Sequence, residues 1–474
     1  MKRFFIAVIL IVCYVSSHAQ SIIGNWEGAA DVGGQKLKAV FHIAKENDQY
    51  TVSFDSPDQH AFGLRCDGLT ISGDSLSISM KVIGGSYKGK WNGADDISGN
   101  LLQGGQAFIL PLKKVSSTVA AMPAAKPQTP KGPFNYIIQE VEYENTLQHV
   151  HLGATLTKPL VGTKFPVVLM ITGSGPQDRD ETIGMHKPFW VIADYLTRHG
   201  IAVLRVDDRG IGKSTGNFAG STSADFATDV MAGIDYLKTR RDVDVTKIGL
   251  MGHSEGGMIA PYVAARDKDV AFIVTLAGSF TGGRALNDFQ NTLPMERSGA
   301  SKEMIASFLQ LHHALVADAV AVNTDAVYNE AIQQTYFDWK KTQTPEMAQS
   351  LIKGQDANVI TELQKNYTAF RNPWWRFVFS YDPATDLQKL NIPALALNGE
   401  KDEQVEPKAD LAVFNEALKK SNSKSYKSIE IPGVNHLFQH CKACGSIPEY
   451  LALDETFDPA TLAIICDWIK EQIK

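Results

Sequence analysis

Ser254 is the residue of this sequence whose neighbours most clearly suggest chemistry. It lies in the run Gly-His-Ser-Glu-Gly-Gly at 252–257, directly after the apolar residues 248–251. The apolar run predicts a buried strand and the residues from 257 onward predict a helix, so Ser254 stands on the turn between them. Gly252 and Gly256 flank it as Gly-x-Ser-x-Gly, because so sharp a turn leaves no room for side chains. The pattern predicts a serine nucleophile, with an ordinary tight turn as the alternative.

A serine nucleophile works with a histidine that takes its proton and a carboxylate that holds this histidine in the right tautomer. Asp402 follows the apolar residues 394–397, and His436 lies on the turn after the next predicted strand. The chain order Ser254, Asp402, His436 is the order found in hydrolases with this kind of nucleophile turn. The sequence therefore predicts these residues as a catalytic triad, with Asp402 preferred over Glu400 as the acid.

Backbone amides are the natural partners of a carbonyl oxygen that becomes negative during acyl transfer. The glycine-rich residues 172–180 follow the predicted strand at 165–171. Glycines there let the backbone approach a substrate closely. The sequence predicts an oxyanion hole made by the amide of Ser174 and the amide of Glu255, which opens the helix after the nucleophile.

A second polar loop, at 207–214, ends like a phosphate-binding loop. A phosphate loop needs glycine where Asp207 stands, so nucleotide binding is rejected. Five charged residues of the two loops are predicted to form a salt-bridge network that braces them, rather than to act in catalysis. They are Asp178, Arg179, Asp180, Asp208 and Arg209.

Other histidines and cysteines could point to different chemistry. His253 adjoins the nucleophile and cannot turn back on it. His436, His440, Cys441 and Cys444 fall in one short run and could suggest zinc, but His436 is needed elsewhere and the four are too crowded to surround one ion easily. In an exported protein a local disulfide between the two cysteines is favoured. We expect no metal and no organic cofactor.

Strands that alternate with helical stretches from residue 134 onward predict a mostly parallel sheet covered on both faces. In such a sheet, ligands bind beyond the carboxyl ends of the strands, so the loops named above should form one site. The predicted helices begin near Pro188, Ser223 and Gly257. The predicted central strands are 165–171, 202–206, 248–251, 272–276 and 394–397.

The N-terminal third of the chain has a different pattern. Residues 1–19 combine Lys2 and Arg3, an apolar run and the small residues before position 20, which predicts a secretory signal cut after Ala19 and a periplasmic or extracellular protein. Residues 20–114 alternate apolar and polar positions between turn clusters and predict a small antiparallel barrel or sandwich. The Ala-, Pro-, Ser- and Thr-rich residues 115–133 predict a linker.

The formal net charge of the chain is -6, and removal of Lys2 and Arg3 would make it more negative. A negative protein is a poor partner for nucleic acid or for an anionic membrane surface. The apolar run near the N-terminus is too short to span a bilayer. We therefore expect a small-molecule substrate, no nucleic acid and no membrane span.

Four motifs in order carry a family resemblance that covers 134–474. The chain resembles the α/β hydrolase superfamily, in particular bacterial acyl esterases with the oxyanion loop Gly-Ser-Gly-Pro-x-Asp-Arg-Asp and the elbow Gly-His-Ser-Glu-Gly-Gly. These stand at 173–180 and 252–257, beside Asp-Arg-Gly-x-Gly-x-Ser at 208–214 and Asn-His at 435–436. The chain is more distantly similar to dienelactone hydrolases and to the catalytic domain of prolyl oligopeptidases. The resemblance implies a carboxylic ester hydrolase.

A long helical insert, from about 285 to 382, interrupts the strand pattern and predicts a cap over the nucleophile. Most of its aromatic residues are expected to form the core of the cap, and a few to line an acyl pocket. We expect an exported serine esterase for small to medium acyl chains. The alternatives are a serine peptidase related to prolyl oligopeptidases, and a non-catalytic binding protein on the same fold.

Overall fold

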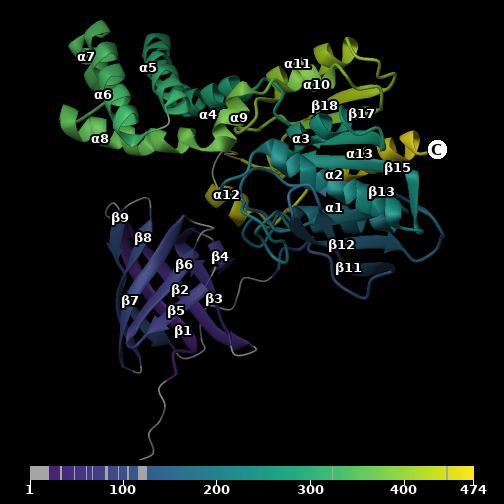
Figure 1. Cartoon of the computed structure of the whole chain (residues 1–474), viewed down its shortest axis with the longest axis horizontal. Coiled ribbons are helices and arrows are strands. Elements are labelled where there is room, and N and C mark those ends of the chain that lie inside the picture. Colours follow the sequence, from purple (N-terminus) through teal and green to yellow (C-terminus); the bar gives the residue numbers. More distant parts are fainter. Residues whose placement is uncertain are drawn as a thin grey trace, which may run out of the picture. The chain divides into compact units, whose positions relative to one another are not determined.

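The computed structural model describes residues 21–32, 35–46, 49–59, 61–66, 68–80, 84–93, 95–103, 106–115, 125–322, 324–442, 444 and 447–474. The predicted export signal at 1–19 lies outside these residues. The chain divides into two compact units, 1–124 and 125–474, so the division falls within the predicted linker (Figure 1). The last part of that linker is bound to the second unit, because Lys126 Nζ donates to the carbonyls of Leu451 at 2.8 Å and Leu453 at 2.6 Å.

The first unit is an antiparallel, barrel-like sheet, as predicted. Its strands follow the order β4-β3-β2-β1-β10-β8-β7-β6-β5, and β9 pairs with β8. Trp26, Phe41 and Tyr87 are fully buried in its core, and Trp26 Nε1 donates to the Ile22 carbonyl at 2.7 Å. Trp26 therefore packs the barrel. The strands are β1 (Gly24–Val32), β2 (Gln35–Glu46), β3 (Gln49–Ser56), β4 (Ala61–Arg65), β5 (Gly68–Ser72), β6 (Ser75–Met80), β7 (Gly85–Gly93), β8 (Asp96–Gln103), β9 (Gln106–Ile109) and β10 (Leu112–Val115), with a short 3-10 turn η1 (Pro57–Gln59).

The second unit is built on a mixed sheet in the order β11-β12-β14-β13-β15-β16-β17-β18. β12 is antiparallel to its neighbours β11 and β14, and the remaining pairs are parallel. This arrangement, with its helices, confirms the predicted α/β hydrolase fold. The strands are β11 (Tyr136–Asn145), β12 (Val150–Pro159), β13 (Phe165–Ile171), β14 (Ala202–Val206), β15 (Val243–His253), β16 (Val270–Leu276), β17 (Ala394–Gly399) and β18 (Tyr426–Ile431).

Helices cover both faces of this sheet. Because successive side chains of a strand point to opposite faces, each strand contributes to two cores. In β13, Val167 and Leu169 belong to the core beneath α2, α3, α10 and α11, whereas Val168 and Met170 belong to the core beneath α1 and α13. The helices are α1 (Pro188–Arg198), α2 (Ser223–Thr239), α3 (Glu255–Ala264), α10 (Pro383–Leu387), α11 (Pro407–Lys419), α12 (Ile447–Ala452) and α13 (Pro459–Gln472).

The insert between β16 and β17 is helical, as predicted, and has a core of its own (Figure 1). Tyr336 and Trp339 are buried in that core, with Phe337, Tyr367 and Phe370 packed against it. Helix α5 is long and apolar enough to cross a membrane by length and composition, but its residues Leu311 and Leu315 contribute to this core. The insert comprises α4 (Gly283–Arg297), α5 (Lys302–Ala321), α6 (Asp325–Thr342), α7 (Pro345–Leu351), α8 (Asp356–Tyr367), η3 (Thr368–Arg371) and α9 (Pro373–Ser380).

Candidate active site

Ser254 lies on a strained turn between β15 and α3. Its φ is 53°, which a residue with a Cβ rarely adopts, and α3 begins directly after it, two residues earlier than predicted. Ser254 is half-buried, whereas every other residue from Ile248 to Pro261 is buried. The turn therefore gives Ser254 an exposure that its neighbours lack. Strain of this kind is maintained by the surrounding fold and is common at functional sites.

The glycines beside Ser254 are required by close backbone contacts. A Cβ added to Gly252 would lie 1.9 Å from the carbonyl oxygen of Gly256, and one added to Gly256 would lie 2.2 Å from the carbonyl oxygen of Ile171. Neither neighbour is a side chain that could rotate away. The absence of a Cβ at both positions therefore allows the turn to form.

We expect Gly252→Ala to destabilise the second unit, because backbone must move to relieve this clash. Overpacking of this kind costs about 1 to 3 kcal/mol, and the rigid neighbour places it at the upper end. Urea unfolding of the variant should show the loss. Gly220→Ala is the matched control, since its Cβ would approach only the Asn217 side-chain amide, at 3.0 Å. Equal stability of the two variants would contradict this account of the turn.

His436 and Asp402 contact each other directly. His436 Nδ1 lies 2.8 Å from Asp402 Oδ2, and both side chains are buried. The other oxygen of Asp402 accepts from the amides of Gln404 at 2.8 Å and Val405 at 2.9 Å. Glu400 instead accepts from the Gly433 amide at 2.9 Å. The structure thus brings His436 together with the predicted acid and not with its competitor.

Asn435 shapes the turn that presents His436. Its Oδ1 accepts from the amides of Leu437 at 2.9 Å and Gln439 at 3.0 Å, and its side chain is fully buried. Ser254 and His436 both lie in the part of the chain that the structure describes, and Ser254 Oγ makes no hydrogen bond to His436 there. Such bonds are often long or poorly aligned without substrate and tighten in the Michaelis complex. The catalytic roles of the three residues stay a prediction.

The predicted oxyanion loop passes beside the nucleophile. A Cβ added to Gly173 would lie 3.3 Å from Ser254 Cβ. The amide of Gly173 already donates to Glu181 Oε1 at 2.7 Å, so it is not free to hold an oxyanion. Ser174 is exposed, and Glu255 begins α3. Their amides stay the predicted donors.

Arg179, Asp180 and Arg209 form ion pairs, whereas Asp178 and Asp208 accept hydrogen bonds from neutral groups, Asp178 from the Asp180 amide at 3.0 Å and the Thr182 hydroxyl at 2.7 Å. Arg179 contacts Asp207 through two nitrogens, at 2.9 and 2.6 Å, Arg205 pairs with Asp180, and Arg209 contacts Asp229 at 2.7 Å. Asp208 differs from the prediction, because its oxygens accept from the Thr172 hydroxyl at 2.6 Å and the Gln177 amide at 2.9 Å. Burial raises the pKa of Asp208 well above its usual range. Asp208 therefore joins the two loops by hydrogen bonds to Thr172 and Gln177.

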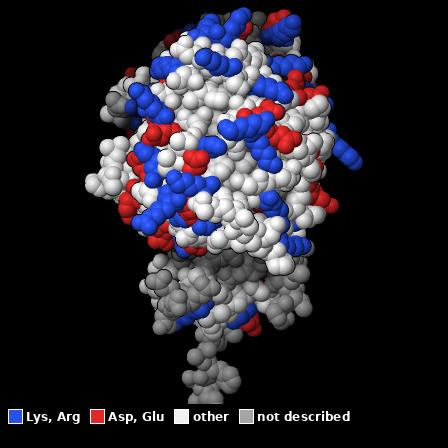
Figure 2. Space-filling model, turned by 90° about the vertical axis from the view of Figure 1, so that its right-hand side faces the viewer, with Lys and Arg blue, Asp and Glu red and all other residues white. Residues whose placement is uncertain are grey.

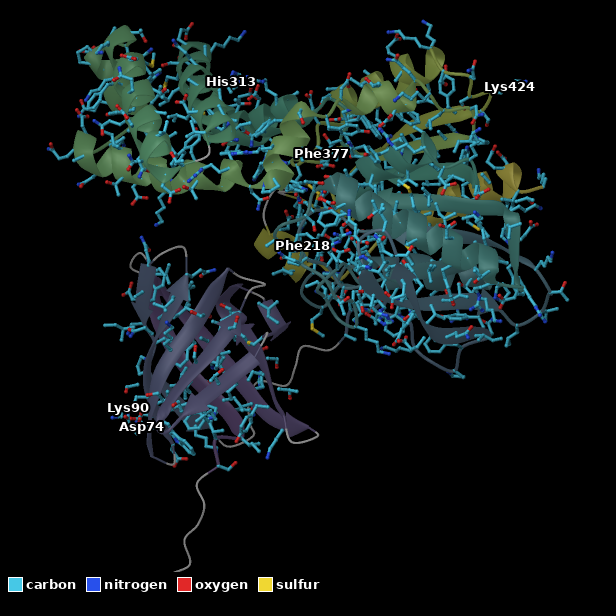
Figure 3. The ribbon with its side chains drawn as sticks, viewed as in Figure 1. Asp74, Lys90, Phe218, His313, Phe377 and Lys424 are labelled. Atoms are coloured by element: carbon cyan, nitrogen blue, oxygen red, sulfur yellow. A yellow bond between two sulfur atoms is a disulfide. The ribbon has the colours of Figure 1, made fainter. Side chains whose placement is uncertain are left out.

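The insert reaches the elbow through Trp374 of α9. Trp374 Nε1 donates to Glu255 Oε1 at 2.7 Å, and the Ser223 hydroxyl donates to the same oxygen at 2.6 Å. Burial raises the pKa of the Glu255 carboxyl. Nearby, the Phe377 ring meets Tyr262 edge-on at 6.2 Å, where the insert joins the sheet domain (Figure 3). The insert is thus attached directly to the helix that follows the nucleophile.

Sequence reasoning missed Glu181 and considered His253 only as a partner for Ser254, whereas the structure brings the two side chains together beside the elbow. His253 Nδ1 lies 3.0 Å from Glu181 Oε1, and His253 Nε2 lies 3.0 Å from the carbonyl oxygen of His436. Both side chains are buried. A histidine next to the nucleophile in a buried turn needs a hydrogen-bond partner, and this need is a signal that the sequence offers. Nothing in the spacing of the two residues, however, identifies Glu181 as that partner.

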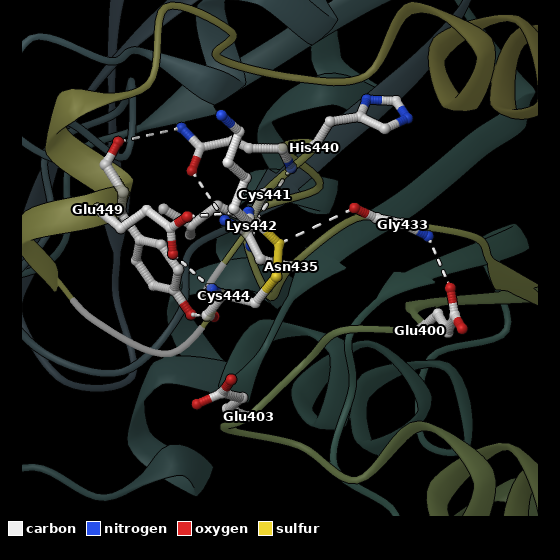
Figure 4. Close-up of a disulfide and its surroundings, with 12 residues drawn as sticks. Glu400, Glu403, Gly433, Asn435, His440, Cys441, Lys442, Cys444 and Glu449 are labelled. Atoms are coloured by element: carbon white, nitrogen blue, oxygen red, sulfur yellow. Dashed lines mark hydrogen bonds between the residues drawn. A yellow bond between two sulfur atoms is a disulfide. The ribbon is translucent and has the colours of Figure 1, made fainter.

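Cys441 and Cys444 are joined by a disulfide, as expected (Figure 4). Its formation removes the two thiolates that a zinc site would use. Nearby, His440, Glu455 and Asp458 bring potential ligand atoms within 4.8 Å of one another. Asp458 caps α13 by accepting from the amides of Ala460 and Thr461, and Glu455 accepts from the His440 amide, so their oxygens already have partners. These hydrogen bonds explain the positions of the two carboxylates within the fold.

Residues 148–438, which include the elbow, Asp402 and His436, match the family described as X-Pro dipeptidyl-peptidase (S15 family). The chain belongs to this family. The match to the S15 family begins after the first unit and covers most of the second, including the insert.

Curated relatives match parts of the S15 region. The chain is similar to esterase EstD of Thermotoga maritima, 34% identical over 134 residues, which are 28% of this chain and 32% of that protein. It is also similar to a triacylglycerol lipase of Burkholderia plantarii, 28% identical over 177 residues, which are 37% of this chain and 46% of the lipase. The chain thus spans about a third to a half of the length of these relatives.

Solved structures with a similar arrangement include Est1E from Butyrivibrio proteoclasticus with bound ferulic acid. It is 18% identical, covers 70% of this chain and 96% of its own, and has a TM-score of 0.38. A dienelactone hydrolase from Anabaena variabilis is 16% identical, covers 71% of this chain and 98% of its own, and has a TM-score of 0.37.

Proposed function

We propose that this protein is a serine hydrolase that cleaves carboxylic esters with small to medium acyl chains. The observation that carries the proposal is the half-buried Ser254 on its strained elbow, together with the buried contact between His436 and Asp402. A serine on such a turn, a histidine and a carboxylate in this chain order are the parts of a nucleophilic triad. The similarity to an esterase and a lipase supports esters as substrates.

In the proposed mechanism, Ser254 Oγ attacks the ester carbonyl while His436 Nε2 takes its proton. Asp402 accepts from His436 Nδ1 and stabilises the imidazolium that forms. The amides of Ser174 and Glu255 donate to the oxyanion. The alcohol leaves with the proton from His436, and water then attacks the acyl-enzyme by the same steps to release the acid. No step requires a metal or an organic cofactor.

The helical insert supports a small substrate. It is bound to the elbow helix through Trp374 and carries aromatic side chains close to it, which would form an apolar wall for an acyl chain. Figure 2 shows Lys and Arg side chains interspersed with Asp and Glu on one face, without a field of a single sign there. This mixed surface and the negative net charge support a small-molecule substrate over nucleic acid.

We also propose that the protein is exported to the periplasm or the cell exterior. The residue pattern at 1–19 supports this proposal, and so does the disulfide between Cys441 and Cys444, since disulfides persist in oxidising compartments. The mass of the protein recovered from the periplasm or medium tests it. A mature chain that begins at Gln20 is expected, and an intact chain retained in the cytoplasm would overturn it.

A second candidate function, an X-Pro dipeptidyl-peptidase, is favoured by the family to which the chain belongs. Such an enzyme would use the same triad on an amide bond. An amine is a poorer leaving group than an alkoxide and needs better-placed protonation by His436. The described residues of the first unit form one barrel-like sheet and not the propeller domain that the resemblance to prolyl oligopeptidases would imply.

We expect kcat/KM to be higher for p-nitrophenyl butyrate than for an alanyl-prolyl p-nitroanilide, because the capped site suits a short acyl chain and an ester. Both substrates release p-nitro chromophores, so one preparation of the mature protein can be assayed against both. A longer acyl ester serves as the control for pocket length, where each methylene contributes about 1 to 3 kcal/mol. If kcat/KM is higher for the prolyl substrate, the protein is a peptidase and the proposal of an esterase is wrong.

A further inference from the structure

Glu181 lies in a loop but differs from an ordinary loop residue in its burial and its backbone conformation. Its side chain is buried, and its φ of 51° is unfavourable for a residue with a Cβ. A conformation of this kind persists only where the surrounding structure imposes it, and it is common at functional sites. The single oxygen Oε1 accepts from the Gly173 amide at 2.7 Å and lies 3.0 Å from His253 Nδ1.

The hydrogen bonds of His253 determine where its protons are. The carbonyl oxygen of His436 can only accept, so His253 Nε2 carries a proton. One more proton then lies between His253 Nδ1 and Glu181 Oε1. Burial lowers the pKa of His253, but the Glu181 carboxylate outweighs this and raises it overall. His253 is thus placed to donate to Glu181 on one side and to His436 on the other.

These contacts connect three separate segments of the site. Glu181 binds the amide of Gly173, the residue before the predicted oxyanion donor Ser174. His253 binds the backbone of His436 and is covalently attached to Ser254. The rings of His253 and His436 also lie 4.8 Å apart, centre to centre. A shift of either loop would therefore strain or break this bridge.

We propose that Glu181 and His253 are positioning residues, which hold the oxyanion loop and the His436 loop in register with Ser254. This inference rests on the proposed triad chemistry but not on whether the substrate is an ester or an amide. Neither residue would contact the reacting atoms. Their effect is exerted through the backbone of Gly173 and of His436, and it should fall on the chemical step more than on substrate binding.

Glu181→Gln tests the bridge with almost no change of shape. A neutral imidazole has one N–H, and an amide oxygen that accepts from Gly173 cannot also stabilise an imidazolium as a carboxylate does. With the glutamine oxygen in the place of Glu181 Oε1, which makes both contacts, at least one of the three contacts is then lost. We expect kcat to fall about 100-fold, the size of effect that an ångström-scale misplacement causes, with KM changed less than about threefold.

The rate is measured on whichever of the butyrate ester and the prolyl amide the wild-type protein turns over, per active site titrated with a phosphonate. Asp386→Asn is the control, since Asp386 is an equally buried carboxylate that pairs with Arg266 beyond the opposite end of α3. This control should keep kcat within about threefold of wild type. A kcat for Glu181→Gln as high as that of the control would overturn the proposal.

His253→Gln provides a second test, which also serves if Glu181→Gln does not fold. A glutamine amide can still donate to the His436 carbonyl but cannot carry the charge that pairs with Glu181. We expect a loss in kcat similar to that of Glu181→Gln. The double variant should be no slower than the worse single variant, because the two substitutions break the same set of contacts. Losses that multiply in the double variant would show independent roles and overturn the bridge. Activity that survives Ser254→Ala would instead refute the triad itself.

Discussion

Ser254→Ala should lower kcat by about 10^6-fold, the loss typical of a nucleophilic serine that acts in a triad. The variant retains the elbow backbone and loses only the Oγ atom of a half-buried side chain, so its melting temperature should stay close to that of wild type. Steady-state turnover of the preferred substrate measures the loss. A fluorophosphonate should label the wild-type protein on the peptide that contains Ser254 and leave the variant unlabelled.

Ser223→Ala is the matched control for this prediction. Ser223 lies close to the elbow, and its buried hydroxyl donates to Glu255 at 2.6 Å. Removal of this hydroxyl costs one hydrogen bond, about 1 kcal/mol, while Trp374 still donates to the same oxygen. Turnover by Ser223→Ala should stay within about tenfold of wild type. Turnover by Ser254→Ala at the level of this control would refute the mechanism.

Asp402→Asn should lower kcat by about 10^4-fold, because an asparagine no longer holds His436 in the tautomer that accepts a proton at Nε2. The contact at stake is the 2.8 Å bond between His436 Nδ1 and Asp402 Oδ2, in which the carboxylate is fully buried. An asparagine keeps the shape of this side chain. The loss should therefore appear in kcat on a protein that remains folded by circular dichroism.

Glu400→Gln is the control for the acid. Glu400 follows the same strand, and a glutamine oxygen can still accept from the Gly433 amide. Turnover by this variant should stay within about tenfold of wild type, since its loss would involve a surface hydrogen bond only. An active Asp402→Asn beside an inactive Glu400→Gln would show that the acid was assigned wrongly. Ser254 and His436 would be unaffected by that result.

Local patterns in the sequence were sufficient to predict the fold of the second unit. The apolar run 165–171 coincides with β13, and the predicted helix starts at Pro188 and Ser223 coincide with those of α1 and α2. Buried parallel strands and amphipathic helices are determined mainly by nearby residues, so each segment can be predicted from its own sequence. The start of α3 was predicted two residues late, because the strained conformation of Ser254 lets the helix begin directly after the serine.

The candidate triad was also predicted from sequence, since each member follows a strand and the carboxyl ends of parallel strands meet at one edge of a sheet. The choice between Asp402 and Glu400 was less secure, because both follow β17 within three residues. Only the fold decided which carboxylate meets His436. The direction of a side chain on a loop depends on the amides around it, here those of Gln404, Val405 and Gly433.

The sequence by itself thus determined the architecture, the elbow and the order of the candidate triad, because these depend on short-range periodicity and on glycines at tight turns. Tertiary structure alone decided that Glu181 meets His253, 72 positions away, and that Trp374 meets Glu255, 119 positions away. Neither pair has a spacing that a helix or strand repeats. Such contacts exist only once the sheet has brought its loops together, and burial then gives them their strength.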